Sequence, residues 1–298
     1  MSEFAAIDAI RESLPGPTHA GEVWIGDDAA VLPRPDGDVF LLAVDTVVAG
    51  VHADLDLTGL ADFGWKAMAA SISDIAAMGA DPGYALVSVA GPAGTNLNEL
   101  YRGIAGAAEA FGCPVVGGDL ANATDLVVSV TVSGSCPGSP VLRRGARPGD
   151  DVWGTGPLGA SAAGLRLLRQ GTTRSSALIA AHTRPVPRVA QGRAARLVGA
   201  TAMIDVSDGF AADLGHISDS SGVGVELNEV PVAEGASLDE ALHGGEDFEL
   251  VFCTPPNADV VAGFSGFPRP VRIGVCTERP GLRLRDEALP PLGWQHQW

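Results

Sequence analysis

The sequence has few positively charged residues for its length. Its 298 residues include 19 Lys and Arg against 36 Asp and Glu, which gives a formal net charge of −17, and no run of Lys or Arg appears. Nucleic acids and anionic membranes would be repelled by such a chain, so we expect neither as a partner. Phosphate ligands would have to be bound through metal ions, backbone N–H groups or a few well-placed arginines.

Cysteine is scarce too. The four cysteines, at positions 113, 136, 253 and 276, are widely spaced and form no C-x-x-C pair. This spacing argues against a zinc site and predicts reduced thiols in a cytosolic protein. No segment resembles a membrane-spanning helix, and acidic residues interrupt the N-terminal stretch where a signal peptide would be apolar. We therefore expect a cytoplasmic enzyme.

Familiar catalytic and nucleotide-binding motifs are missing. The sequence has no Walker A pattern, no Rossmann G-x-G-x-x-G and no G-x-S-x-G elbow, and no cysteine has an evident histidine partner. The glycine-rich stretch 154–159 fits neither nucleotide fingerprint and is interpreted as a plain turn between a strand and a helix. Any nucleotide would bind through a less familiar architecture, and covalent catalysis finds little support.

The hydrophobic pattern predicts an α+β (mixed α/β) protein of two domains. With 46% hydrophobic residues, the chain is long enough for two cores of ordinary size. A loop rich in Gly, Pro and Ser at 133–140, followed by an arginine-rich turn at 143–150, is the best candidate boundary. We therefore expect domains at residues 1–137 and 138–298.

Periodicity predicts the elements of each domain. For the first domain we expect helices at 4–13, 60–78 and 97–111 and strands at 39–44, 84–90, 114–116 and 126–133. For the second domain we expect strands at 151–155, 203–205, 223–227, 248–253 and 271–275, and helices at 160–169, 175–181, 186–198 and from a Ser207-Asp208 cap to about 219. The continuous apolar run at 39–44 is typical of a central strand that ends at Asp45 and Thr46.

Asp74 is the only charge in the apolar helical stretch from Ala67 to Ala80. An ionised carboxylate inside an apolar helix costs several kcal/mol unless it is paired or bound to a metal. The nearest charges in sequence are Lys66, about two turns away, and Asp81, which has the same sign. Asp74 therefore requires a cation from elsewhere.

Four further acidic clusters could share that cation. Each places an Asp beside glycine or at an expected strand end, and any one of them alone would be interpreted as a turn. Together with Asp74 they predict a Mg²⁺ site that serves phosphate chemistry, since Mg²⁺ commonly bridges carboxylates and substrate phosphates. The carboxylates in question are Asp28, Asp45, Asp119, Asp205 and Asp208.

Other residues near these clusters allow two interpretations. Arg143, before a turn, could bind a nucleotide phosphate or be solvated. His52 could contact a substrate, although a lone loop histidine is usually neither ligand nor base. Gly118 would let the backbone approach a ligand, and Glu246 could bind a cationic or hydroxylated group. The segment 182–188, with two prolines and two arginines, is interpreted as a structural link.

Taken in order, these stretches resemble one family. The series I-G-D-D-A-A, D-T-V-V-A-G-V-H, G-W-K-A, S-D-I-A-A-M-G-A, V-V-G-G-D, R-x-G-A-R-P-G-D, H-x-R-P-x-P-R, D-V-S-D-G and G-G-E-D-F-E-L is similar to that of the thiamine-monophosphate kinases. That family belongs to the AIR-synthase-related superfamily of enzymes that use ATP. Each motif is weak alone, whereas their combination over residues 25–294 is specific.

The resemblance implies a fold, a reaction and a set of site residues. It implies direct in-line transfer of the ATP γ-phosphoryl group to thiamine monophosphate, with several Mg²⁺ ions, and a homodimer whose N-terminal sheets form a barrel. By motif position, the metal ligands are Asp28, Asp45, Asp74, Asp119, Asp205 and Asp208. The ATP contacts are Gly118, Asp119, Arg143 and Ser207, and the substrate contacts are His52, Glu246 and the aromatic Trp294.

The chain also departs from the family pattern. Ala43 and Val44 replace hydroxyl residues before Asp45, Ser71 replaces an Asn, and Ala160 stands where an Asp often follows Leu-Gly. Side-chain metal contacts from positions 43 and 44 are therefore lost, and the four changes together leave the number of metal ions open. Two alternatives remain: another ATP-dependent enzyme of the superfamily, such as an AIR synthase, and a catalytically silent nucleotide-binding dimer.

Overall fold

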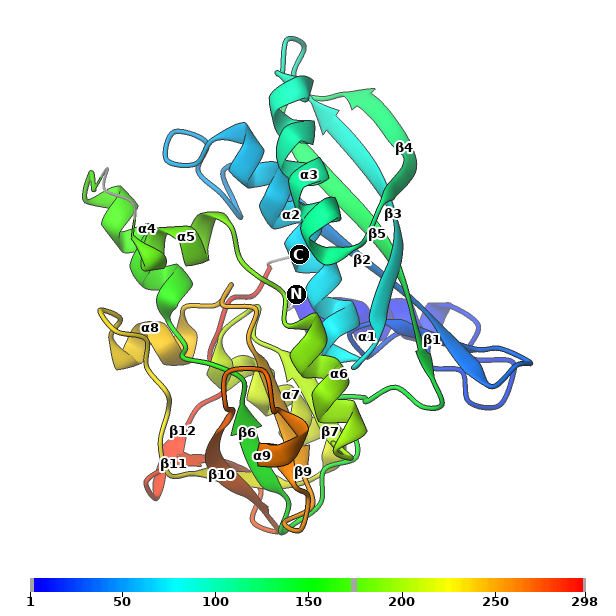
Figure 1. The fold of residues 1–298 in the computed structure, drawn as a ribbon, viewed down its shortest axis with the longest axis vertical. Coiled ribbons are helices and arrows are strands. Elements are labelled where there is room, and N and C mark those ends of the chain that lie inside the picture. Colours follow the sequence, from blue (N-terminus) through cyan, green and yellow to red (C-terminus); the bar gives the residue numbers. More distant parts are fainter. Residues whose placement is uncertain (1–2, 173–175, 297–298) are drawn as a thin grey trace.

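The computed structural model describes residues 3–172 and 176–296 and contains two β-sheets with helices packed around them (Figure 1). The first sheet has five strands in the order β1-β2-β5-β3-β4. All neighbours in it are antiparallel except β3 and β4, which run parallel. Its strands are β1 (Ala30–Pro33), β2 (Asp38–Val48), β3 (Asp81–Gly91), β4 (Val115–Asn122) and β5 (Val127–Pro137).

Helices α2 (Leu60–Ala77) and α3 (Leu97–Phe111) cover one face of this sheet (Figure 1), while α1 (Glu3–Ser13) lies apart from it. The two covering helices approach each other closely because glycines face their contact. A Cβ added at Gly64 would overlap the carbonyl oxygen of Leu100, and one at Gly103 would overlap that of Ala61. Large apolar side chains of α2, such as Ile72 and Ile75, fill the core beneath. This packing holds α2 in a fixed position over the sheet.

Within residues 3–172 and 176–296, the other face of the sheet is largely uncovered. Along β2 and β3 every second side chain is exposed, including Val44, which is 63% exposed, and Tyr84, which is 62% exposed. The strand predicted at 39–44 is confirmed as part of β2, which lies between β1 and β5. It does not end at Asp45 and Thr46, however, because β2 continues to Val48 and pairs antiparallel to β5. An antiparallel sheet can leave one face open in this way.

The second sheet has seven strands in the order β12-β11-β8-β10-β6-β9-β7. It is antiparallel except between β8 and β11. Its strands are β6 (Asp151–Gly154), β7 (Ala202–Asp205), β8 (Gly224–Leu227), β9 (Leu250–Thr254), β10 (Val271–Thr277), β11 (Gly281–Leu284) and β12 (Glu287–Leu289). The hairpin of β11 and β12 was not predicted, since both strands are short and lack a strong apolar alternation.

The helices of this second half are α4 (Ala160–Arg169), α5 (Ala177–Thr183), α6 (Val189–Leu197), α7 (Phe210–Ser221), α8 (Leu238–His243) and α9 (Val260–Gly263). The helix predicted at 160–169 is confirmed as α4. The helix predicted from residue 186 is α6, which begins three residues later, after Pro187. Helix α5 was expected from Ser175, which lies outside the described residues. The stretch 154–159 is indeed the connection from β6 to α4.

The C-terminal end of α2 joins the two halves. Its residues Ala76 and Ala77 belong to a core shared with β7, β9 and α6, whereas Ile72 and Ile75 belong to the core of the first sheet. A Cβ at Gly192 of α6 would overlap the Ala76 carbonyl oxygen, so the contact is close. The helix thus ends between the two sheets, where Asp74 lies.

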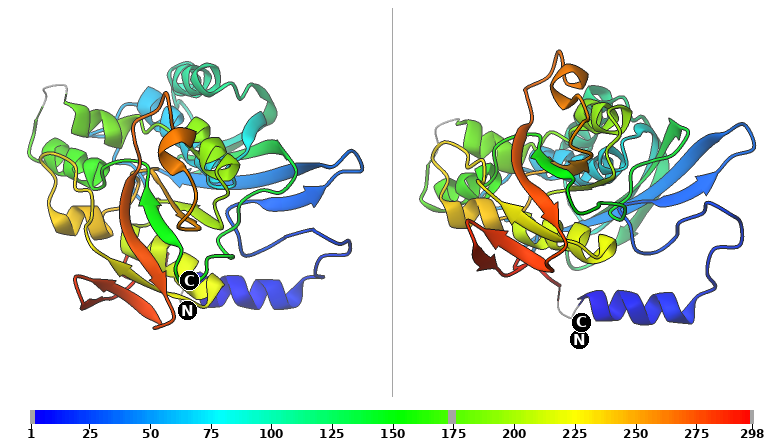
Figure 2. Two further views of the ribbon diagram at one scale, coloured as in Figure 1. Left: turned by 60° about the horizontal axis from the view of Figure 1, so that its bottom comes forward. Right: turned by 90° about the horizontal axis from the view of Figure 1, so that it is seen from below.

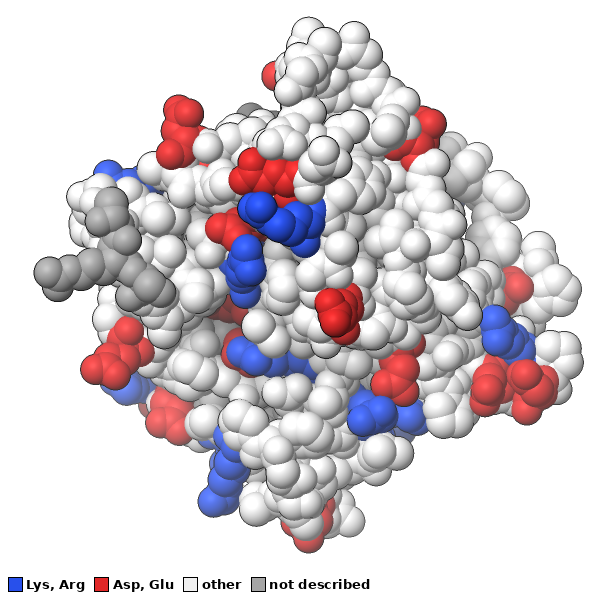
Figure 3. All heavy atoms as spheres, turned by 45° about the horizontal axis from the view of Figure 1, so that its top comes forward, with Lys and Arg blue, Asp and Glu red and all other residues white. Residues whose placement is uncertain are grey.

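The two ends of the described chain lie side by side (Figure 2), and the His296 N–H donates to Glu3 Oε2 at 2.9 Å. On the face shown in Figure 3, acidic and basic side chains are interspersed, with large uncharged areas between them. Within residues 3–172 and 176–296, no helix is both long and apolar enough to cross a bilayer.

Candidate active site

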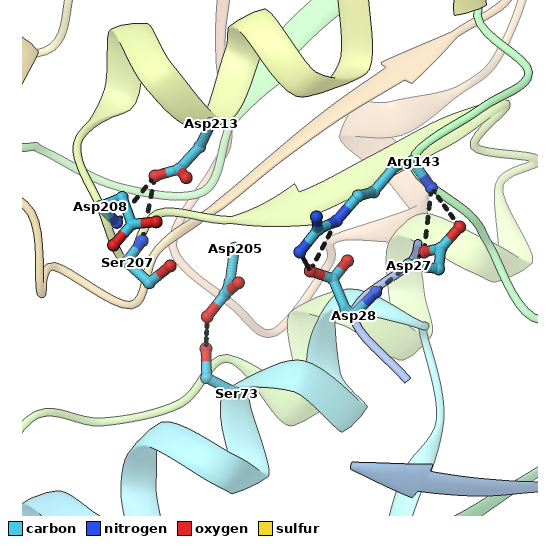
Figure 4. Close-up of polar contacts among 8 residues, drawn as sticks. All are labelled: Asp27, Asp28, Ser73, Arg143, Asp205, Ser207, Asp208 and Asp213. Atoms are coloured by element: carbon cyan, nitrogen blue, oxygen red, sulfur yellow. Dashed lines mark hydrogen bonds and ion pairs between the residues drawn. The ribbon is translucent and has the colours of Figure 1, made fainter. Parts of the chain in front are cut away.

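Three of the predicted carboxylates meet at the end of α2. Asp28 precedes β1, Asp74 lies in the last turn of α2, and Asp205 ends β7. One carboxylate oxygen of each lies within 4.8 Å of those of the other two. Residues far apart in the sequence thus converge on one point, as Figure 4 shows for Asp28 and Asp205.

Two neighbours hold these carboxylates in place. The hydroxyl of Ser73, next to Asp74, donates to Asp205 Oδ2 at 2.5 Å. Arg143 donates to Asp28 Oδ1 through Nε at 3.0 Å and through its terminal nitrogen at 2.6 Å (Figure 4). The other oxygen of Asp28 is buried and accepts no hydrogen bond from the described residues. A buried, unpaired carboxylate oxygen is costly, and a bound cation would satisfy it.

The electrostatics also favour a cation. Burial, and then the charges of Asp45, Asp205 and Asp28, raise the pKa of Asp74 well above its ordinary value. Burial and the neighbouring Asp28 raise the pKa of Asp205 to about 7 and that of Asp45 to about 6. Carboxylates that disfavour each other's ionised form are a suitable donor set for a divalent cation such as Mg²⁺.

These shifts predict how stability depends on pH. A carboxyl whose pKa is higher in the folded than in the unfolded protein stabilises the fold at low pH, and this stabilisation is lost as the pH rises through the folded pKa. Without metal, the free energy of unfolding should therefore fall between about pH 4 and pH 7. Mg²⁺ should restore it, raising the melting temperature by at least about 2–4 °C more at about pH 7.5 than at about pH 5. Calorimetry in EDTA measures the pH dependence of stability, and calorimetry with Mg²⁺ measures the rise in melting temperature. An equal rise at the two pH values would contradict the prediction.

Asp45 and Asp208 lie around this cluster. Asp45 lies on the same face of β2 as buried Leu41 and Ala43, the face that packs against α2. Its negative charge contributes to the raised pKa of Asp74. Burial, and then the charges of Glu3 and Asp45, raise the pKa of Asp208 to about 6. The structure therefore brings five of the six predicted metal ligands into one region.

The loop that carries Ser207 and Asp208 is organised by a residue that the sequence reasoning missed. Asp213, 2% exposed in the first turn of α7, accepts the backbone N–H groups of Ser207 and Asp208 at 3.1 and 3.2 Å (Figure 4). It also accepts the N–H of Gly209 at 3.1 Å. The prediction that Ser207 and Asp208 cap α7 was wrong, because the cap is Gly209 and no side chain caps it. An acidic residue in the first helical turn was the available signal.

Gly118 and Asp119 do not join the cluster within one chain. The predicted short strand continues through both residues to Asn122, and Asp119 is exposed on β4, the edge strand, level with Ser88 of β3. A Cβ at Gly118 would overlap the Val87 carbonyl oxygen, so the sheet itself requires glycine there. Strands β5 and β3 separate β4 from Asp45 on β2.

The three predicted substrate contacts lie around a second feature, the C-terminal segment 292–296. The backbone N–H of Trp294 donates to the Asp208 carbonyl oxygen at 2.8 Å. The centroid of the Trp294 ring lies 5.9 Å from that of the His296 ring. The His296 ring lies 5.3 Å from that of His52. The His52 carbonyl oxygen and the Glu246 carboxylate both accept from Lys66 Nζ. His52, Glu246 and Trp294 are therefore linked to one another and to the loop of Ser207 and Asp208, since the Glu246 N–H also donates to the Ser207 carbonyl oxygen at 2.7 Å.

The protonation of His52 can be assigned from its contacts. Its Nδ1 accepts the Val48 N–H at 3.0 Å, so a neutral ring carries its proton on Nε2. Burial lowers the pKa of His52, which favours this neutral form. Its free nitrogen is therefore a hydrogen-bond donor.

The segment 182–188 links the two halves, as predicted. The Trp65 indole N–H donates to the Pro185 carbonyl oxygen at 2.8 Å, and Arg184 pairs with Asp62 of α2. Arg188 pairs with Glu249, whose other oxygen accepts from the Thr155 hydroxyl at 2.6 Å. These contacts tie α2 to the second sheet beside the site.

Two departures from the family pattern have structural substitutes. Ser71 donates to the Val130 carbonyl oxygen at 2.9 Å and so binds α2 to the sheet. Ala160 has no carboxylate to place at the N-terminus of α4, but Asp247 places one there. Its carboxylate accepts the N–H groups of Gly159 at 2.6 Å and Ser161 at 3.1 Å.

Comparison with known proteins agrees with this arrangement. Residues 26–136 match the AIR synthase related protein, N-terminal domain, and residues 147–287 match the corresponding C-terminal domain. Thiamine-monophosphate kinase of Bacillus subtilis is 39% identical over 84% of this chain and 82% of its own length. That of Methanopyrus kandleri is 37% identical over 95% of this chain and 92% of its own length.

The chain belongs to the thiamine-monophosphate kinase family. Among solved structures, AaThiL complexed with AMPPCP and TMP superposes with a TM-score of 0.88 at 31% identity, covering 99% of this chain and 97% of that one. Membership of this family confirms the resemblance found in the motifs and makes the protein a kinase. It also explains why the acidic clusters, none of them specific alone, occur together.

Proposed function

We propose that the protein transfers the γ-phosphoryl group of ATP to thiamine monophosphate and so forms thiamine diphosphate and ADP. The observation that carries this proposal is the similarity over nearly the whole chain to a solved relative that holds AMPPCP and TMP. The convergence of Asp28, Asp74 and Asp205 supports it, since both reactants are polyanions whose charge a bound cation would offset.

We propose that Mg²⁺ is held by Asp28, Asp45, Asp74, Asp205 and Asp208. The orphaned oxygen of Asp28 and the mutual repulsion of the carboxylates support this assignment. When bound, Mg²⁺ would neutralise the charge of the phosphates that have to approach each other. Asp119 remains a proposed ligand whose place on the exposed edge strand does not by itself support the role.

The remaining predicted contacts are proposals for the two substrates. Gly118, Asp119, Arg143 and Ser207 are assigned to ATP, and His52, Glu246 and Trp294 to thiamine monophosphate. Trp294 is 53% exposed, so its ring has a free face for an aromatic substrate. A phosphate acceptor is already ionised at neutral pH, so the residues have to orient it and need not deprotonate it.

We also propose a homodimer and a domain boundary at residues 137 and 138. The uncovered face of the first sheet, with Leu42, Val44, Tyr84 and Leu86 exposed, supports the dimer, because a second sheet placed on this face would bury them. A barrel formed by two such sheets would also protect the edge strand β4. The boundary rests on the end of β5 at Pro137 and the separate cores on either side.

The test is to incubate the purified protein with ATP, Mg²⁺ and thiamine monophosphate and to measure thiamine diphosphate by chromatography. We expect product that depends on all three components, and none when EDTA replaces Mg²⁺. Formation of the product without thiamine monophosphate, or turnover only with another substrate of the superfamily, would refute the proposal.

A further inference from the structure

Lys66 is a buried ammonium group that the proposed chemistry does not use. It lies in α2 and is 1% exposed. Its Nζ donates to Glu246 Oε2 at 2.8 Å and to the His52 carbonyl oxygen at 3.3 Å. A charged amine removed from water is tolerated only when it is paired and hydrogen-bonded. Lys66 therefore requires Glu246 at this position.

Glu246 in turn has an unusual backbone conformation. Its φ is +56°, in the left-handed region that side chains other than glycine rarely adopt, and it follows Gly245 at +66°. Its N–H donates to the Ser207 carbonyl oxygen at 2.7 Å. A strained residue at a functional site persists only when surrounding contacts hold it. The ion pair with Lys66 holds its side chain.

The two oxygens of the Glu246 carboxylate have different surroundings. Oε2 faces Lys66 Nζ and lies 3.6 Å from Nδ1 of His182, a residue that is 2% exposed. Burial, and then the charge of Lys66, lowers the pKa of His182 to about 3, so this ring stays neutral. Within the described residues, Oε1 accepts no hydrogen bond, and the side chain is 28% exposed. One oxygen is fixed, and the other is available.

We infer that Lys66 is a positioning residue for thiamine monophosphate: it holds Oε2 of Glu246 so that Oε1 can accept a hydrogen bond from the substrate. The complementary donor is the amino group on the pyrimidine ring of thiamine, which carries N–H groups and no charge of its own. The inference rests on the proposed function. It also explains why an ammonium group is buried near a substrate whose thiazolium ring is cationic, since Glu246 cancels its charge.

The test is a double-mutant cycle of Lys66→Met and Glu246→Gln, with KM measured separately for both substrates. Lys66→Met should raise KM for thiamine monophosphate about tenfold and change kcat and KM for ATP less than about twofold. In the Glu246→Gln background, Lys66→Met should raise that KM no further, because it acts only through Glu246. Lys66→Gln keeps an N–H donor and should give an intermediate KM for thiamine monophosphate. It replaces Lys66→Met in the cycle if the Met variant does not fold.

Arg184→Ala is the matched control, because Arg184 joins the same helix to the same segment through Asp62 but at an exposed ion pair. Its kinetic constants should equal those of the wild type. Equal increases of both KM values in a folded Lys66 variant would indicate a merely structural role and overturn the inference. So would independent effects in the double variant. Absence of wild-type turnover with thiamine monophosphate would instead refute the proposed function.

Discussion

Asp74→Asn should lose roughly 1,000-fold in Mg²⁺-dependent kcat, which corresponds to about 4 kcal/mol of transition-state stabilisation. Asparagine keeps the shape of the side chain but removes the negative charge at the centre of the cluster, where oxygens of Asp28 and Asp205 lie within 4.8 Å. The same change should stabilise the metal-free protein, because it removes a buried carboxylate that its neighbours repel. Activity and stability should therefore change in opposite directions.

Steady-state kinetics and calorimetry in EDTA measure the two effects of Asp74→Asn. Asp81→Asn is the control, since this carboxylate follows the same helix but is exposed and pairs with Arg193. It should leave kcat unchanged. An Asp74→Asn protein that keeps wild-type kcat would show that Asp74 is not a metal ligand. A variant that melts at a lower temperature than the wild type without metal would show that its neighbours do not repel the Asp74 carboxylate.

Asp213→Ala should impair both folding and catalysis. The substitution leaves three backbone N–H groups of the Ser207–Gly209 loop without their acceptor. Each unsatisfied group costs about 1 kcal/mol or more, so the free energy of unfolding should fall by roughly 3 kcal/mol. The loop carries Asp208, a proposed metal ligand, and displacement of such a group by about 1 Å can cost about 100-fold in rate.

Urea unfolding and kcat, measured where the variant is still folded, test this expectation. Asp259→Ala is the control, because Asp259 caps α9 by accepting a single N–H, that of Ala262, in an exposed position. It should cost about 1 kcal/mol and leave kcat unchanged. If Asp213→Ala were no more destabilising than this control, the three bonds to Asp213 would not organise the loop.

Sequence reasoning identified the candidate site residues whose signal was local. Asp74 could be predicted because a charge inside an apolar helical pattern has no local explanation. The helices 60–78 and 97–111 followed from their periodicity and are confirmed as α2 and α3. The acidic clusters were found as a set, and the structure brings most of them together although they come from elements far apart in the chain.

What the sequence could not predict depended on contacts between distant segments. In the sequence, Lys66 is only a charge two turns from Asp74, because its partner, Glu246, lies 180 residues away. The strand predicted at 114–116 was too short. Gly117 and Gly118 suggest a turn in the sequence, but in the sheet they permit close pairing of β4 with β3. Likewise, Ser207 and Asp208 resemble caps, yet buried Asp213 binds their N–H groups instead.

The position of α2 has a consequence for how the protein moves. Within one turn of this helix, Ile75 packs into the core of the first sheet and Ala76 into the core next to the second. The two halves therefore cannot separate by a hinge without pulling α2 out of one of these cores, and they should behave as one cooperative unit. Any closure around bound reactants has to come from peripheral segments, such as the tail of Trp294, while the carboxylates and Glu246 stay in place.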